Sequence, residues 1–268
     1  MSTLLASLRA RADALAELEP EARADEPDAV HQMRVAARTL RANLRTFADV
    51  LPDTGELLRL TSELDWLGDA LGPAREAEVM SELVLDLLEH TPPELVVGPV
   101  RERVEQVFGL DHDAALVVVA EALDSERYQD LLRTLAAYLE SATVTGKPDP
   151  GKLHRKVRRR MRAALAMPPG AERDVAMHEA RKAARRTRYA AEALGRPSKP
   201  VKALQDVLGE EHDRVVAAAA LTDLAAGAHL AGENAFTYGV LLGLLRCDSK
   251  RFDKRLRRAW KEARKELL

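Results

Sequence analysis

The sequence predicts an all-α fold, and three observations support this class. Alanine, leucine, arginine and glutamate dominate the composition, and these residues favour helices, whereas runs of β-branched residues are scarce. Apolar residues recur at three- and four-residue spacing, and no stretch sustains the alternation of period two that a strand requires. Prolines and glycines interrupt the helical pattern repeatedly. With 46% hydrophobic residues, the chain can bury a real core.

Proline and glycine clusters predict where each helix ends. The breaks fall near residues 19–27, 51–55, 72–73, 91–99, 144–151, 167–170, 195–200 and 227–232. The segment 143–151 is polar, carries two prolines and two glycines, and lies near the middle of the chain. It predicts a boundary between an N-terminal helical bundle, residues 1–145, and a C-terminal helical bundle, residues 146–268. At Leu208 and Gly209 we also expect a helix to end and another to begin.

An internal repeat spans that boundary. The segment from His31 to Arg41 aligns with the segment from His178 to Arg188, and six of the eleven positions are identical: the histidine, three arginines and two alanines. A second pair follows in the same order, because Leu-Gly-Pro-Ala-Arg-Glu at 71–76 aligns with Leu-Gly-Glu-Glu-His-Asp at 208–213. Two matches in one order indicate a duplication, and hence two similar bundles of about four helices.

The repeated pattern His-x-x-Arg-x-x-x-Arg-x-x-Arg places its basic residues on one face of a helix. At about 100° per residue, the basic residues of 31–45 fall within an arc of about 80°, away from the apolar residues. This stripe consists of His31, Arg34, Arg38, Arg41 and Arg45. The second copy repeats the geometry with His178, Arg181, Arg185 and Arg188, and it is widened by Lys182, Arg186 and Tyr189.

Charge is strongly segregated along the chain although the net charge is only −2. Four basic segments, 31–45, 152–162, 178–188 and 250–265, together carry +22, so the remainder carries −24. A solvated helix face normally mixes signs, with acids placed to pair with bases four residues away, yet 31–45 contains no acid. Two interpretations stay open: the stripes bind an anionic ligand, or acids elsewhere in the protein neutralise them.

Arginine stripes of this kind suit a linear chain of phosphates. The guanidinium group binds phosphate through two parallel hydrogen bonds, and successive stripe residues are separated by about 5 Å along the helix. Other basic helices would supply further walls of the binding site. The additional candidates are Arg155, Arg158, Arg159, Arg162, Lys202, Lys254 and Arg258.

His31 and His178 head the two stripes, and several roles are open for them. Each could donate a hydrogen bond to phosphate, ligate a metal or make a buried structural hydrogen bond. The sequence has no His-x-x-x-His pair and no Glu-x-x-His motif, so we expect no metal site at these histidines. His212 and Asp213 could cap or buttress the neighbouring basic helix.

No enzyme signature is present in the sequence. It lacks a glycine-rich phosphate loop and a G-x-S-x-G turn, and its single cysteine, Cys247, excludes a thiolate metal site. We therefore expect a non-catalytic protein without a cofactor. The longest apolar run, 235–245, is too short to span a bilayer, and residues 4–8 are too short for a signal peptide, so the expected location is the cytoplasm.

The two histidine-arginine helices, each followed by Leu-Gly-x-x-Arg/His-Glu/Asp, resemble the CHAD family (conserved histidine α-helical domain). The resemblance extends from about residue 5 to about residue 265. It implies two four-helix bundles related by pseudo-twofold symmetry, with basic helices lining a shared groove. It also implies binding of inorganic polyphosphate, association with polyphosphate granules in some members, and a separate polyphosphate-metabolising enzyme as a partner. The family often has Arg-Asp where this chain has Arg75-Glu76 and His212-Asp213, which puts ligand contact by these residues in doubt.

Two alternative functions remain. A nucleic-acid-binding protein would use the same phosphate chemistry, but aromatic residues for base stacking make up only 4% of the chain, so nucleic acid is the less favoured partner. A metal-dependent phosphate-handling enzyme, or a histidine that accepts a phosphoryl group, is the other alternative.

Overall fold

A computed structural model describes residues 3–247 and 249–267 of the chain, and every regular element in that part is a helix, which confirms the all-α class. The first half contains α1 (Thr3–Glu17), α2 (Glu19–Arg23), α3 (Ala29–Thr46), α4 (Thr54–Ala70), α5 (Gly72–Glu89), the 3₁₀ helix η1 (Pro93–Leu95), α6 (Val100–Asp124) and α7 (Glu126–Ser141). The second half contains α8 (Gly151–Ala166), α9 (Ala171–Ala193), α10 (Lys199–Leu230), α11 (Phe236–Cys247) and α12 (Ser249–Glu266).

The two Leu-Gly motifs differ in how they affect their helices. In the first copy, α4 ends at Ala70 and α5 begins at Gly72, with Pro73 at the first turn, where a missing N–H is tolerated. In the second copy, α10 runs without interruption through Gly209, so the expected helix end at Leu208 was wrong. A glycine alone costs a helix only about 1 kcal/mol, which packing can offset, whereas proline removes a hydrogen bond.

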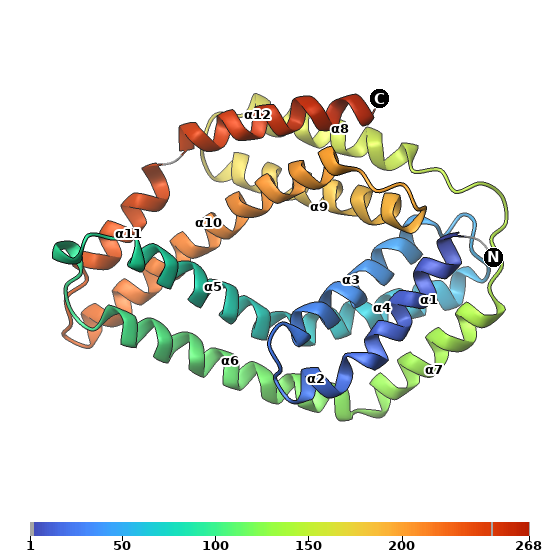
Figure 1. The fold of residues 1–268 in the computed structure, drawn as a ribbon, viewed down its shortest axis with the longest axis horizontal. Helices are drawn as coiled ribbons and strands as arrows, with labels where there is room; N and C mark the ends of the chain where they lie inside the picture. The colour runs from blue at the N-terminus through green and yellow to red at the C-terminus, as the bar shows by residue number, and fades with distance from the viewer. Residues whose placement is uncertain (1–2, 248, 268) are drawn as a thin grey trace.

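The buried apolar side chains form three clusters rather than one core per half. The first cluster joins α1, α2, α3, α4 and α7 with the last turns of α6 and α9. The second joins α8, α9, α12 and the start of α10. The third joins α5 and the start of α6 with the later part of α10 and with α11, so it draws on both halves of the chain (Figure 1).

The boundary expected at residues 145 and 146 falls in an extended connection between α7 and α8. This connection is fixed to the first half, because the Thr145 backbone N–H donates to the Val50 carbonyl over 2.8 Å. The division into two pseudo-twofold bundles stays a prediction, since the third cluster belongs to neither half alone. Among the described residues, the helices lack the combination of length and apolarity that crossing a bilayer requires.

The helices α3 and α9, which carry the two repeated stripes, contact each other, and their ribbons converge toward their C-terminal ends (Figure 1). Small residues allow this approach: Ala190 and Ala193 of α9 are fully buried and belong to the same cluster as the apolar face of α3. The fold therefore brings two basic helices, far apart in sequence, into contact.

Candidate anion-binding surface

The guanidinium groups of α3 and α9 face one another where the two helices meet. The charge of Arg181 acts on Arg34, the charge of Arg38 acts on Arg185, and the charge of Arg186 acts on Arg41. These six residues, named here the arginine cluster, are Arg34, Arg38, Arg41, Arg181, Arg185 and Arg186. The structure thus brings together the central residues of both predicted stripes.

The arginine cluster is electrostatically strained in the free protein. Burial is the main cause that lowers the pKa values of Arg34, Arg41, Arg181 and Arg185, and repulsion from neighbouring arginines lowers them further. The largest shift takes the pKa of Arg185 to about 10. All four groups remain charged at neutral pH, so an anion placed among them would relieve both the lost solvation and the repulsion.

The protein's own acids neutralise only the margins of this cluster. Arg41 forms an ion pair with Asp65, and Arg181 Nη2 lies 3.9 Å from Asp213 Oδ1. Among residues 3–247 and 249–267, no carboxylate forms an ion pair with Arg34, Arg38 or Arg185, and the charge of Glu76 acts on Arg34 only from a longer distance.

Two side-chain nitrogens at this surface, His31 Nδ1 and Arg38 Nε, are buried and have no hydrogen-bond partner in the described part of the chain. Buried polar groups are normally satisfied, and Arg38 Nε can only donate, so it adds to the deficit of acceptors, whereas the role of His31 Nδ1 depends on the tautomer of the ring. Internal neutralisation therefore accounts for the edges of the arginine cluster and leaves its centre in need of negative charge.

Each Leu-Gly motif makes room for one arginine of the cluster. A Cβ atom at Gly72 would lie 3.7 Å from Arg34 Nη2, and a Cβ atom at Gly209 would lie 3.7 Å from Arg181 Nε. Because Arg34 and Arg181 occupy equivalent positions of the repeat, the same guanidinium-on-glycine contact occurs twice. The two Leu-Gly motifs thus position one arginine in each of the two histidine-arginine motifs.

Substitutions at Gly209 are expected to separate helix stability from arginine placement. Alanine fits at ordinary contact distance, and it should stabilise α10 by roughly 0.5–1 kcal/mol, because glycine is a poor helix former. Leucine has no such room and should push the guanidinium of Arg181 away from its position. Thermal unfolding and anion affinity measured on Gly209→Ala and Gly209→Leu test this: a loss of affinity in the alanine variant would contradict the steric account.

The two histidines at the heads of the stripes have matching neighbours. His31 lies near the charge of Arg75, and His178 Nδ1 lies 3.2 Å from His212 Nδ1, with the rings 4.5 Å apart. Arg75 and His212 hold the same position in the Leu-Gly motif. Burial and nearby cationic groups lower the pKa values of His31 and His178, and they lower the pKa of His212 to about 4. All three histidines are therefore neutral at pH 7. His212 and Asp213 contact α9 from α10, as a buttress would.

Tyr189 lies among the arginines and was not among the predicted site residues. Burial raises the pKa of its hydroxyl, but the charges of Arg38, Arg185 and Arg188 and a hydrogen bond with Arg38 outweigh burial and lower it. The guanidinium of Arg188 also stacks over the ring at 4.7 Å. The sequence places Tyr189 on the widened second stripe but does not predict a contact with the ligand.

Several predicted residues are paired within the protein instead of contributing to the cluster. Arg188 donates to Gln205 and to Glu192, each over 2.7 Å. Lys202 pairs with Asp206 at 2.7 Å on the surface of α10, and Lys182 pairs with Glu179. Arg45 is exposed at the end of α3.

The basic helices α8 and α12 lie in the second cluster with α9 and α10. Arg155, Arg159 and Arg162 are exposed, Arg158 is half-buried, and Lys254 and Arg258 are exposed on α12. The residues of α8 that approach α9 are different ones: the charge of Arg186 acts on Lys156, and Arg160 forms an ion pair with Glu179 over 3.4 Å. Lys156 and Arg160 approach α9 because of the rotational orientation of α8 about its own axis. Helix periodicity alone does not predict that orientation.

Comparisons with known proteins agree with this architecture. The family model for the CHAD domain matches residues 6–222. Two curated relatives, the uncharacterized proteins Rv2226 and MT2285 of two strains of Mycobacterium tuberculosis, are each 38% identical over 230 residues. That match covers 82% of this chain but only 45% of each relative, so the chain spans about half of their length.

Two solved structures share the fold. PptA from Streptomyces chartreusis superposes with a TM-score of 0.78 at 23% identity, covering 97% of this chain and 98% of that one. The CHAD domain from the plant Ricinus communis superposes with a TM-score of 0.67 at 23% identity, covering 96% and 90%. At this identity, the likeness establishes the fold and leaves the site to be argued from its own residues.

Proposed function

Because the chain belongs to the CHAD domain family, we propose that it binds inorganic polyphosphate at the arginine cluster, as a module without catalytic activity of its own. Polyphosphate binding is the known role of the family. The observation that carries the proposal for this chain is the convergence of six guanidinium groups from α3 and α9, with no carboxylate ion-paired to Arg34, Arg38 or Arg185 in the described residues.

The geometry favours a linear polyanion over a single compact anion. Along each helix, the stripe residues are about 5 Å apart, so consecutive phosphate groups can meet successive guanidinium groups. Lys156 continues the positive surface from Arg186 onto α8. The exposed arginines of α8 and α12 would add long-range attraction rather than direct contacts, and their effect should be the first to vanish as salt is added.

The experiment that tests the proposal is a competition measurement with polyphosphate of defined lengths. A long chain should bind, orthophosphate should not compete at equal phosphate concentration, and affinity should fall about 10²- to 10³-fold between 50 and 200 mM salt as counterions are released. DNA or RNA that displaces polyphosphate at equal phosphate concentration would favour the nucleic-acid alternative instead.

The non-catalytic part of the proposal is tested separately. Protein incubated with polyphosphate and divalent metals should release no phosphate and should carry no phosphohistidine at His178 or His212. Detection of either product, lost in the His178→Gln variant, would replace the binding proposal with the enzymatic one.

The proposed location is the cytoplasm, in association with polyphosphate granules and with a separate polyphosphate-metabolising enzyme. A fluorescent fusion should concentrate on granules in polyphosphate-rich cells and disperse when polyphosphate synthesis is blocked. A fusion that stays diffuse in both conditions contradicts the granule association but leaves binding itself open to the competition measurement.

A further inference from the structure

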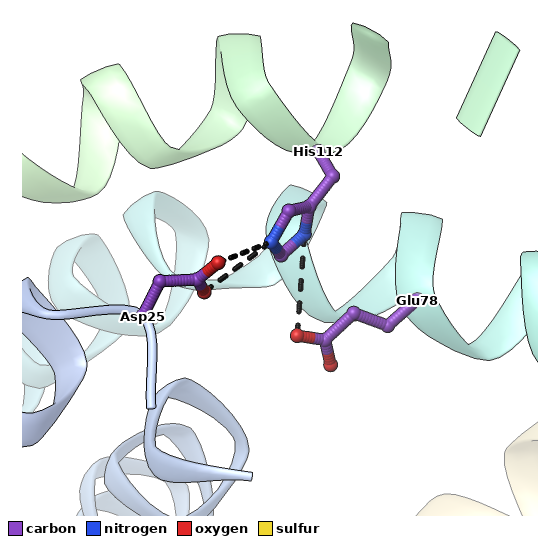
Figure 2. A group of neighbouring side chains, drawn as sticks. All are labelled: Asp25, Glu78 and His112. Atoms are coloured by element: carbon purple, nitrogen blue, oxygen red, sulfur yellow. Dashed lines mark hydrogen bonds and ion pairs between the residues drawn. The ribbon is translucent and has the colours of Figure 1, made fainter. Parts of the chain in front are cut away.

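Asp25, Glu78 and His112 converge from three separate elements beside the arginine cluster. Asp25 lies in the connection between α2 and α3, Glu78 lies on α5, and His112 lies on α6 (Figure 2). One donor atom from each lies within 4.8 Å of one donor atom from each of the others. His112 and Glu78 are mostly covered, with exposed side-chain fractions of 18% and 26%.

The surroundings of the His112 ring consist of oxygen acceptors. Nε2 lies 3.1 Å from Asp25 Oδ2, while Nδ1 lies 3.3 Å from the Ala74 carbonyl and 3.9 Å from Glu78 Oε1. A neutral imidazole has one N–H group and one nitrogen with a lone pair. The nitrogen with the lone pair would therefore face an oxygen lone pair, which is repulsive. The arrangement requires a positive charge, which is either a second proton on the ring or a metal ion.

The ligand set and its support match a metal site. A hydrogen bond from Nδ1–H to the Ala74 carbonyl would fix the ring and leave the Nε2 lone pair for a metal, which is the usual arrangement around ligating histidines. Glu78 is held through its other oxygen, since Arg75 Nη1 lies 2.8 Å from Oε2, so Oε1 is left toward His112. Ligand atoms about 2.1 Å from a tetrahedral ion are roughly 3.4 Å apart. His112 Nε2 and Asp25 Oδ2 are 3.1 Å apart, and one donor atom from each of the three residues lies within 4.8 Å of the others, so a small closure of Glu78 toward Nε2 would complete the set.

We propose that Asp25, Glu78 and His112 form a binding site for a divalent transition-metal ion of the Zn²⁺ class, with solvent completing its coordination. Imidazole nitrogen together with carboxylate oxygen suits Zn²⁺ and its neighbours, whereas Mg²⁺ and Ca²⁺ prefer oxygen alone. The ion links the connection before α3 to α5 and α6. Its ligand Glu78 lies three residues after Arg75 in the sequence, and its ligand Asp25 lies six residues before His31. The ion therefore fixes the base of the anion-binding surface without touching the anion.

Zinc titration of metal-free, untagged protein tests the site. Polyphosphate is left out because it chelates zinc itself, so failure of the metal site and failure of polyphosphate binding are distinguishable. The titration is run near pH 8, because the hydrogen bonds to Asp25 and Ala74 outweigh burial and raise the pKa of His112, so that protons compete with the metal at lower pH. We expect one zinc ion per chain and an affinity at least about tenfold weaker in Asp25→Asn and His112→Gln, which is about 1.4 kcal/mol.

Matched controls separate this site from other histidines. His90→Gln removes an exposed histidine that also faces a carboxylate, Asp86 at 3.5 Å, and should leave zinc binding unchanged. His178→Gln removes the histidine pair with His212 and should also leave it unchanged. Cobalt substitution should give visible absorption bands that disappear in His112→Gln.

Asp25→Asn keeps the test decisive if His112→Gln fails to fold, because Asp25 is exposed and its backbone φ of 51° is one that asparagine adopts readily. Zinc binding that survives in Asp25→Asn, that is lost in His178→Gln instead, or that is absent from the folded wild-type protein overturns the proposal. In each of those cases, the second proton on His112 supplies the positive charge.

Discussion

Replacing Arg38 and Arg185 together by glutamate is expected to abolish polyphosphate binding while the fold is kept. These two residues lie at the centre of the arginine cluster, where the charge of one acts on the other and no carboxylate in the described chain pairs with either. Each charge-assisted hydrogen bond to phosphate contributes about 1.5–3 kcal/mol, so removing both groups and adding repulsion should lower affinity by at least 10³-fold. Equilibrium binding to long-chain polyphosphate at a fixed salt concentration measures the loss.

The control for this double variant carries the same change of charge elsewhere. Arg11 and Arg133 are exposed on α1 and α7 and belong to neither stripe, so Arg11→Glu with Arg133→Glu should weaken binding only through long-range attraction. Circular dichroism and thermal unfolding establish that both proteins fold, and Arg38→Gln with Arg185→Gln replaces the glutamate pair if it does not. Equal affinities for the cluster variant and its control would show that the anion binds elsewhere.

Lowering the pH from 7.5 to 5.5 is expected to strengthen polyphosphate binding by about tenfold. His31, His178 and His212 have lowered pKa values in the free protein because they are buried among cations. A bound polyanion favours their charged forms and raises those pKa values, so the complex takes up protons. Binding that takes up about one proton strengthens by up to tenfold per pH unit in the range between the free and bound pKa values. Isothermal titration in two buffers of different ionisation enthalpy measures the proton uptake directly.

Over the same pH range, the three histidines should lower the folding stability of the ligand-free protein as the pH falls, whereas they strengthen binding. A lowered pKa means that the unfolded chain binds more protons than the folded one between pH 6.5 and the folded value, which is about 4 for His212. The contribution of these three histidines to stability without ligand therefore falls as the pH falls, and polyphosphate should restore it, whereas His112, whose pKa is raised, contributes in the opposite direction. His178→Gln with His212→Gln should flatten both profiles, whereas the exposed His229→Gln should not. A pH-independent affinity in the wild-type protein would mean that the histidines lie outside the reach of the anion's charge.

The sequence predicted the helices and the stripes well because both depend on local periodicity. The cationic arc on α3 follows from residues three and four apart, and its partner on α9 follows from the repeat. What the sequence could not supply is the rotation of one helix against another. Lys156 and Arg160 of α8 approach α9, while Arg155, Arg159 and Arg162, which share a face by periodicity, are exposed.

Two further differences arise from tertiary pairing. Arg188 belongs to the repeated motif, yet it donates to Gln205, because α10 packs against α9, and to Glu192 one turn later on α9 itself. The convergence of Asp25, Glu78 and His112 could not be foreseen, since the three residues have no characteristic spacing and meet only when α5 packs on α6.

The third apolar cluster means that neither half of the chain is self-sufficient. It is built from α5 and α6 of one sequence copy and from α10 and α11 of the other, so neither copy covers that surface alone. A fragment ending at residue 145 would leave Met80, Val84 and Phe108 without their partners on α10 and α11. A protein made of one copy alone would therefore need a second molecule of itself to cover this surface, and its folding would depend on its concentration. In the present chain the same contact is intramolecular and independent of concentration.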